Sequence, residues 1–213
     1  MPIKYKCLII DDHPLLRKGI KDLLIEEGLC QIVVEAACAE VALTAVRREP
    51  WDLLILDIAL PDKHGLEVLK EVKLLRRTLP VLMLSLYPER EFALRAIKAG
   101  AAGYITKDQT PVELVTAVRQ VLSGRRYITP SLADQMADLL DVGQSATLHE
   151  TLSDREMEVL RLLGQGRTIS GVAVDLALSV KTISTYRSRL LEKLRLGTTA
   201  DLVRYAIEHH LTV

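Results

Sequence analysis

The chain has 213 residues, enough for two domains, and 49% of them are hydrophobic, so each domain could bury a core. Its 28 basic and 28 acidic residues cancel, which excludes an overall field for nucleic acid or membranes, so any basic surface must be local. No apolar run approaches the roughly 18 residues of a membrane span, and no signal peptide precedes the first strand. Three cysteines without CxxC spacing indicate buried thiols in a reducing, cytoplasmic compartment.

The first 124 residues alternate short apolar runs with amphipathic stretches, separated by Gly and Pro. Uninterrupted apolar runs are typical of strands buried on both faces of a parallel sheet. The pattern predicts an α/β fold, with a five-stranded doubly wound parallel sheet. We expect strands at residues 6–10, 31–36, 53–57, 81–84 and 103–106, and helices at 14–27, 40–48, 65–77, 89–99 and 111–122.

After Arg126 the pattern changes to helices alone. A weak helical stretch at 132–140 precedes a polar segment, 141–147, that is typical of a flexible linker. Further on, a short helix, a tight turn and a longer helix form a helix-turn-helix pattern. The expected helices are 154–163, capped by Ser153 with Glu156; about 171–176; 180–194, capped by Ser179 and ended by Gly197; and one to about 209, capped by Thr199.

Acidic residues follow two of the expected strands. Asp57 ends the strand 53–57, and Asp11 and Asp12 follow the strand 6–10. Because doubly wound sheets bind ligands beyond the carboxyl ends of their strands, these three carboxylates should lie together at one edge. They would repel one another without a cation, and Mg²⁺ prefers such oxygen ligands.

Two more polar residues stand at strand ends, Ser85 and Lys107. With the acids they provide each role that phosphoryl transfer requires. Asp57 can attack as a carboxylate nucleophile and form an acyl phosphate, while Asp11 and Asp12 can hold the cation. Ser85 can donate a hydrogen bond to a phosphoryl oxygen, and Lys107 can pair with another.

These residues resemble the receiver domain of two-component response regulators over about residues 4–124. The matching pieces are Ile10-Asp11-Asp12-His13, Leu56-Asp57 with Leu60-Pro61 and Gly65, Ser85, and residues 100–107, which read GAAGYITK. The resemblance implies that Asp57 takes phosphate from a sensor histidine kinase. It also implies that Asp11, Asp12, Asp57 and the backbone carbonyl of Ala59 bind Mg²⁺, and that Ser85 and Tyr104 form a switch pair.

The expected helix 181–194 carries a local positive charge. It places Ile183, Leu190 and Leu194 on one face, and small polar residues on the other. Residues 181–195 contain five basic side chains and one acid. Small residues would let the helix lie deep in the major groove of DNA, while basic side chains at its rim meet phosphates.

Residues 149–211 closely resemble the LuxR-type helix-turn-helix of the NarL/FixJ regulators, in the pieces TLSDRE at 151–156, LRLL at 160–163 and SVKTI at 179–183. By this resemblance the base-reading residues are Ser184, Thr185 and Ser188. The phosphate contacts would be Lys181, Thr182, Tyr186, Arg189 and Lys193. The segment 169–173 reads ISGVA, where the family usually has Asn-Lys-Glu-Ile-Ala. The charged pair is lost, and Gly171 costs the helix about 1 kcal/mol relative to alanine.

The two resemblances together imply a phosphorylation-controlled transcription factor, not an enzyme, which binds double-stranded DNA as a homodimer. The expected domains are a receiver at 1–126, a linker at 127–148 and a DNA-binding domain at 149–213. Two alternatives stay open. A phosphatase with an aspartyl-phosphate intermediate usually has a second acid two residues after its nucleophile, where this chain has Ala59. A constitutive DNA-binding protein with a vestigial receiver would not need the complete set of acids, Ser85 and Lys107.

Overall fold

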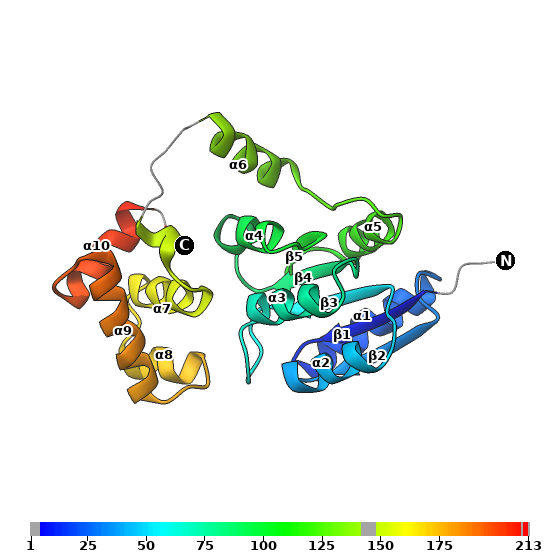
Figure 1. Ribbon diagram of the computed structural model, residues 1–213, viewed down its shortest axis with the longest axis horizontal. Coiled ribbons are helices and arrows are strands. Elements are labelled where there is room, and N and C mark those ends of the chain that lie inside the picture. Colours follow the sequence, from blue (N-terminus) through cyan, green and yellow to red (C-terminus); the bar gives the residue numbers. More distant parts are fainter. Residues whose placement is uncertain (1–4, 142–147, 210, 213) are drawn as a thin grey trace. The chain divides into compact units, whose positions relative to one another are not determined.

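The computed structural model describes residues 5–141, 148–209, 211 and 212. They form two compact units, which meet in the sequence between Asp141 and Val142 (Figure 1). The expected linker segment 141–147 therefore lies outside the described residues except for Asp141. None of the helices described has both the length and the apolar character that crossing a bilayer requires.

The first unit contains the predicted five-stranded parallel sheet (Figure 1). Its strands run in the order β2-β1-β3-β4-β5, and every neighbouring pair is parallel. The strand order changes direction between β1 and β3, so the edge beyond their carboxyl ends is where such a sheet binds ligands. The strands are β1 (Lys6–Ile10), β2 (Ile32–Ala36), β3 (Leu53–Asp57), β4 (Val81–Ser85) and β5 (Gly103–Thr106).

Helices cover both faces of the sheet, which explains why β3 and β4 are buried at every residue. α1 and α5 contact each other over one face, where Ile9 and Ile55 pack in a core with Leu24 and Val118. Along the chain, α2 contacts α3, and α3 contacts α4. The helices are α1 (Pro14–Glu26), α2 (Ala39–Arg48), α3 (Gly65–Leu75), α4 (Glu89–Lys98) and α5 (Pro111–Leu122).

The predicted cysteine environment is confirmed for two of the three thiols. Cys7 and Cys30 are buried and free, whereas Cys38 is free but only partly buried. Cys38 is the N-cap residue of α2 and lies outside the hydrophobic core cluster that contains Cys7 and Cys30.

The weak helical stretch expected at 132–140 is a full helix, α6 (Pro130–Asp141), and it belongs to the first unit. It packs against α4. The Thr129 hydroxyl donates a hydrogen bond of 2.6 Å to the Glu89 carboxylate, and Leu132 is fully buried. Tertiary contacts with α4 therefore stabilise a helix whose sequence signal is weak.

The second unit is helical in its described part. It contains the short 3₁₀ helix η1 (Leu148–Thr151) followed by α7 (Asp154–Gly164), α8 (Ile169–Asp175), α9 (Val180–Leu194) and α10 (Thr199–Glu208). Ser153 and Glu156 form the predicted capping box, and Ser179 caps α9 as expected. α8 forms in spite of Gly171, because its N-cap Thr168 accepts a hydrogen bond from the Gly171 amide and Val172 is buried.

Two of the predicted capping residues differ from those in the structure. The N-cap of α10 is Thr198 rather than Thr199, because Thr198 has an acid, Asp201, three residues later and the two form a capping box. α9 ends at Leu194 as predicted, but its C-cap is Arg195, which adopts the left-handed conformation with φ 57°, rather than Gly197. The Leu196 amide then donates to the Leu191 carbonyl and closes the last turn.

The turn between α8 and α9 gives a stability prediction. Ala177 has φ 52°, a conformation that costs roughly 1–2 kcal/mol for a residue with a Cβ. Ala177→Gly removes that cost and adds the backbone entropy loss of glycine, so we expect the free energy of unfolding to rise by up to about 1 kcal/mol. Urea unfolding followed by circular dichroism measures it. Ala200→Gly, in α10, is the matched control and should lower stability; an equal loss in Ala177→Gly would contradict the strain.

Candidate functional site: an acidic pocket and a basic helix

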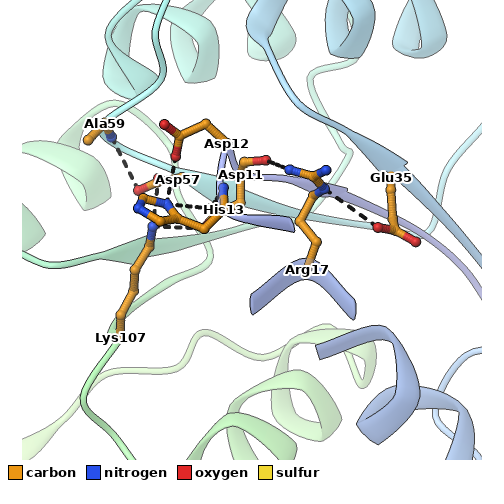
Figure 2. A network of polar contacts seen from close by, with 8 residues as sticks. All are labelled: Asp11, Asp12, His13, Arg17, Glu35, Asp57, Ala59 and Lys107. Atoms are coloured by element: carbon orange, nitrogen blue, oxygen red, sulfur yellow. Dashed lines mark hydrogen bonds and ion pairs between the residues drawn. The ribbon is translucent and has the colours of Figure 1, made fainter. Parts of the chain in front are cut away.

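Three carboxylates gather where β1 and β3 end, as predicted (Figure 2). Side-chain ligand atoms of Asp11, Asp12, Asp57 and His13 all lie within 4.8 Å of one another. Asp11 and Asp57 are fully buried, whereas Asp12 and His13 are exposed. The parallel register that pairs Ile10 with Leu56 brings the two strand ends level, so the fold itself produces this cluster.

Lys107 joins two of these acids. Its ammonium Nζ lies 2.7 Å from Asp57 Oδ2 and 2.7 Å from Asp11 Oδ2, and its side chain is only 5% exposed. Burial tends to lower the pKa of Lys107, but Asp57 and Asp11 outweigh it and raise that pKa above its ordinary value. Lys107 is therefore a largely buried cation that contacts two carboxylates of the acidic cluster.

For Asp57, burial has a larger effect on the pKa than the neighbouring positive charge. Burial is the largest influence and raises the pKa of this carboxyl, the Lys107 charge lowers it, and the Asp11 charge raises it again. Asp57 Oδ1 also accepts a hydrogen bond of 3.2 Å from the Ala59 amide. The net effect raises the pKa of Asp57 above its ordinary value, because one lysine does not fully compensate for burial beside a second carboxylate.

The loop after Asp57 folds back onto the strand end. The Gly65 amide donates to the Ile58 carbonyl at 2.8 Å. A Cβ at Gly65 would lie 2.1 Å from the Asp57 carbonyl oxygen, which no side chain tolerates. Only glycine lets α3 begin this close to the acidic pocket, so the loop and Ala59 are held beside Asp57.

Two residues that the sequence analysis did not assign support the pocket (Figure 2). The His13 ring Nδ1 lies 2.6 Å from Asp12 Oδ1, and the His13 amide donates to Asp11 Oδ1 at 2.7 Å. The Arg17 guanidinium donates to the Asp11 carbonyl and lies 3.5 Å from the Glu35 carboxylate. A basic residue one turn into the helix after an acidic pair was the available signal for Arg17.

The acidic pocket has the properties of a site for a hard divalent cation. Asp11 Oδ2 is buried and contacts Lys107, yet among the described residues it lacks a hydrogen bond of acceptable geometry. The negative charge of three carboxylates also exceeds the positive charge of Lys107. Oxygen ligands with excess negative charge match the preference of Mg²⁺ and similar ions.

Ser85 and Tyr104 are connected through one residue, Tyr87. Ser85 ends β4, beside β3, and its Oγ accepts a hydrogen bond of 2.9 Å from the Tyr87 amide. The hydroxyl of Tyr104 donates to the Tyr87 carbonyl at 2.8 Å. The two side chains of the predicted switch pair therefore hold the same peptide segment, and a change at Ser85 can reach Tyr104 through it.

The second unit presents the predicted α9 surface. Ile183, Leu190 and Leu194 are buried, and Lys181, Thr185, Ser188 and Arg189 are exposed, while Thr182, Ser184 and Tyr186 are partly exposed. Each predicted base-reading hydroxyl donates to the carbonyl four residues earlier, at 2.9 Å for Ser184, 3.0 Å for Thr185 and 3.1 Å for Ser188. In this arrangement these oxygens are free to accept hydrogen bonds from a base but not to donate them.

Two basic residues of α9 are engaged within the second unit. Lys193 Nζ lies 2.6 Å from the Glu156 carboxylate on α7. Burial raises the pKa of Glu156, but hydrogen bonds from Lys193 and Ser153 outweigh it and lower that pKa below its ordinary value. Arg187 donates to the Thr199 hydroxyl at 2.6 Å. As a phosphate contact, Lys193 would have to leave Glu156.

Comparisons with known proteins agree with both halves. Residues 7–119 match the family model of the response regulator receiver domain, and residues 150–206 match that of the bacterial regulatory proteins of the luxR family. The response regulator UvrY of Escherichia coli K12 is 33% identical over 96% of this chain and 94% of its own. The response regulator GacA of Pseudomonas aeruginosa PAO1 is 35% identical, over 96% of each chain.

Among solved structures, RcsB from Salmonella enterica serovar Typhimurium bound to the rprA promoter has the same fold. The TM-score is 0.62 at 23% identity, over 95% of this chain and 98% of the other. The chain belongs to the two-component response regulators, a class that joins a receiver to an output domain. Within that class it is a DNA-binding transcriptional regulator of the NarL/FixJ family, with a LuxR-type helix-turn-helix.

The raised pKa of Asp57 predicts how stability depends on pH. Because the folded state holds this proton more tightly than the unfolded chain, the carboxyl favours folding in acid, and this contribution is lost as the pH rises through the folded pKa. Asp57→Asn should therefore raise the free energy of unfolding at pH 7 without divalent cations, by more than the ~0.5 kcal/mol of a surface substitution. Urea unfolding measures it.

The increase in the free energy of unfolding that Asp57→Asn gives should become smaller as the pH falls through the folded pKa of Asp57. Asp134→Asn, an exposed change on α6, is the matched control and should show no such trend. A variant that is less stable than the wild type at pH 7 would mean that the ion pair with Lys107 outweighs the burial of Asp57.

Proposed function

We propose that this regulator accepts a phosphoryl group on Asp57 from a sensor histidine kinase, and that phosphorylation controls dimerisation and promoter binding. One observation carries the proposal. A buried carboxylate stands at the strand edge with Lys107 and two further acids, in the same chain as a helix-turn-helix with a basic reading helix. We place the receiver at 1–126, the linker at 127–148 and the DNA-binding domain at 149–213.

Phosphoryl transfer to Asp57 is a nucleophilic displacement at phosphorus. A carboxylate oxygen of Asp57 forms a bond to phosphorus, the bond from phosphorus to the kinase imidazole nitrogen breaks, and that nitrogen takes up a proton. Lys107 Nζ, which contacts Asp57 Oδ2, pairs with a phosphoryl oxygen as charge develops. The Ala59 amide, which donates to Asp57 Oδ1, holds the carboxylate in position for attack.

Asp11, Asp12, Asp57 and the Ala59 carbonyl would hold Mg²⁺ in this pocket. When bound, the ion neutralises charge on the carboxylates and the incoming phosphoryl group. His13 and Arg17 position this site rather than act in the chemistry, since they bind the side chain and the carbonyl of Asp11.

Ser85 and Tyr104 would report the phosphoryl group. If Ser85 Oγ turns to donate to a phosphoryl oxygen, it loses the hydrogen bond that it accepts from the Tyr87 amide. The segment that leads into α4 then moves with Tyr104, whose hydroxyl holds the Tyr87 carbonyl. Phosphorylation would in this way shift the populations of the receiver's conformations.

The DNA-binding domain would insert α9 into the major groove as a dimer that reads two half-sites. Ser184, Thr185 and Ser188 would face the bases. Their hydroxyl protons are already donated to the helix backbone, so they favour base groups that donate, or the thymine methyl. The phosphate contacts would be Lys181, Thr182, Tyr186, Arg189 and Lys193.

A phosphatase is the less favoured alternative, because the position two residues after Asp57 is Ala59, which cannot act as a general acid. We therefore propose a cytoplasmic regulator without turnover of outside substrates. Steady release of phosphate from a generic phosphomonoester would contradict this view.

The first test is phosphorylation itself. The full chain is incubated with Mg²⁺ and acetyl phosphate, then intact mass, oligomeric state and DNA retention are measured. We expect one added phosphate, more dimer and tighter DNA binding, because Asp57 is the buried acceptor beside Lys107.

Two variants serve as controls for this test. Asp57→Asn should gain no phosphate, whereas Asp134→Asn should behave as the wild type does. Phosphate on both variants would place the acceptor elsewhere. An unchanged affinity for DNA after complete phosphorylation would favour the constitutive DNA-binding protein.

The DNA contacts have a separate test in salt dependence. Each phosphate contact on duplex DNA adds about 0.9 to the slope of log affinity against log salt. Arg189→Gln should lower the magnitude of that slope by about this amount. It should also weaken binding to a similar extent for all DNA sequences. Fluorescence anisotropy at several salt concentrations measures it. Arg204→Gln, on α10 and paired with Asp201, is the control; equal slopes for Arg189→Gln and wild type would exclude Arg189.

A further inference from the structure

A second concave site lies at the opposite edge of the receiver sheet from Asp57. It is a hollow of about 620 Å³, and its wall includes the residues just before three strands, namely Tyr5, Asp52 and Pro80. Since all strands are parallel, this edge holds their amino ends, whereas the acidic pocket lies at their carboxyl ends. The hollow therefore has no part in the phosphorylation chemistry described above.

Four cations line this hollow against one acid. Lys73 and Arg77 come from α3 and the turn after it, and Arg125 and Arg126 follow α5. In the part of the chain that the structure describes, none of the four forms an ion pair with a carboxylate. The acid, Asp52, already accepts a hydrogen bond of 2.7 Å from the Lys6 amide. In a chain with zero net charge, this is a local positive excess that no carboxylate of the described residues neutralises through an ion pair.

Lys73 is partly buried, whereas the other three cations are exposed. Its stem lies over Gly100, where an added Cβ would come within 3.4 Å of two of its carbons, and its Nζ donates to the Leu79 carbonyl at 2.6 Å. Burial and then the charge of Arg126 lower the pKa of Lys73. Because Lys73 and Arg126 line the same hollow, an anion bound there would lie beside both charges.

The walls also contain apolar surface, from Tyr5, Pro80, Val121 and Leu122. The volume lies within the roughly 300–1,000 Å³ of small-molecule sites. Guanidinium groups bind phosphate oxygens in pairs, and an ammonium adds a point charge. Several such groups above partly apolar walls match a small organic molecule with more than one phosphate.

We propose that this hollow, at the amino ends of the strands, binds a small anion with two or more phosphates, such as a nucleoside triphosphate or an inorganic oligophosphate. Arg125 and Arg126 are the residues through which the chain leaves α5 toward α6. Next to them, the Tyr127 amide donates to the Ala102 carbonyl at 2.8 Å. The bound anion would hold this exit segment against the sheet, and so act on the connection to the DNA-binding domain.

The test measures binding to the full chain by titration calorimetry, with ATP and with tripolyphosphate, both without Mg²⁺. Amide NMR shifts at Thr78, Gly100 and Gly124 locate the site. Arg77→Gln/Arg126→Gln should lose about tenfold or more in affinity, because charge-assisted hydrogen bonds are removed. Arg47→Gln/Arg48→Gln, exposed at the end of α2, is the matched control and should bind as the wild type does.

Two further variants separate this hollow from other sites. Asp57→Asn should keep the affinity, which excludes the acidic pocket. Lys181→Gln/Arg189→Gln should also keep it; if this variant loses the affinity while Arg77→Gln/Arg126→Gln keeps it, the anion binds the DNA-reading helix and the proposal is overturned. Absence of shifts at the three amides at millimolar anion overturns it as well.

Tighter binding of ATP than of tripolyphosphate would show that the apolar walls contact the organic part and would support a nucleotide. Tighter or equal binding of tripolyphosphate would support the inorganic source. Thermal unfolding of each variant checks that the loss of affinity does not reflect loss of the fold.

Discussion

The ion pairs of Lys107 with Asp57 and Asp11 are the constraint on which the receiver depends. Two carboxylates that have left water would be costly side by side, and a single buried ammonium makes their proximity possible. The compensation is partial, as the raised pKa of Asp57 shows. This incomplete balance fits the proposed function, in which the acidic pocket binds a cation and Lys107 exchanges a carboxylate for a phosphoryl group.

Charge in this protein is separated locally although the total is zero. The acidic pocket has excess negative charge at one edge of the sheet, and the hollow with Lys73 and Arg126 has excess positive charge at the other. The exposed side of α9 adds a third, basic region. Because salt screens charges over roughly 8–10 Å, each region acts on its own ligand rather than through a common field.

Hydrogen bonds near the carboxyl end of β4 connect Ser85 and Tyr104 to one peptide segment, and connect the start of α4 to α6. Ser85 and Tyr104 both bind Tyr87, and Glu89, two residues further, accepts from Thr129 at the start of α6. A short path therefore joins the carboxyl end of β4 to the start of α6, and it combines the chain from Tyr87 to Glu89 with the hydrogen bond between Glu89 and Thr129. The contact between α4 and α6 packs the first part of the proposed linker against the receiver, within the first compact unit.

The sequence by itself determined the sheet, the order of its elements, the acidic cluster and the surface of α9. These depend on local patterns: apolar runs that end in acids, capping residues, and the 3.6-residue period of a helix. Helix ends were the least secure, because the tandem pair Thr198 and Thr199 offers two caps and only the partner Asp201 selects one.

The tertiary structure alone decided the features that join residues distant in the sequence. Examples are the pairing of Lys193 with Glu156, the ion pair of Arg17 with Glu35, the packing of α6 on α4, and the gathering of Lys73 and Arg126 around one hollow. No local period encodes these contacts. They arise when the sheet closes, since only then do the ends of elements far apart in the chain become neighbours, and only then does burial set the charge balance of each group.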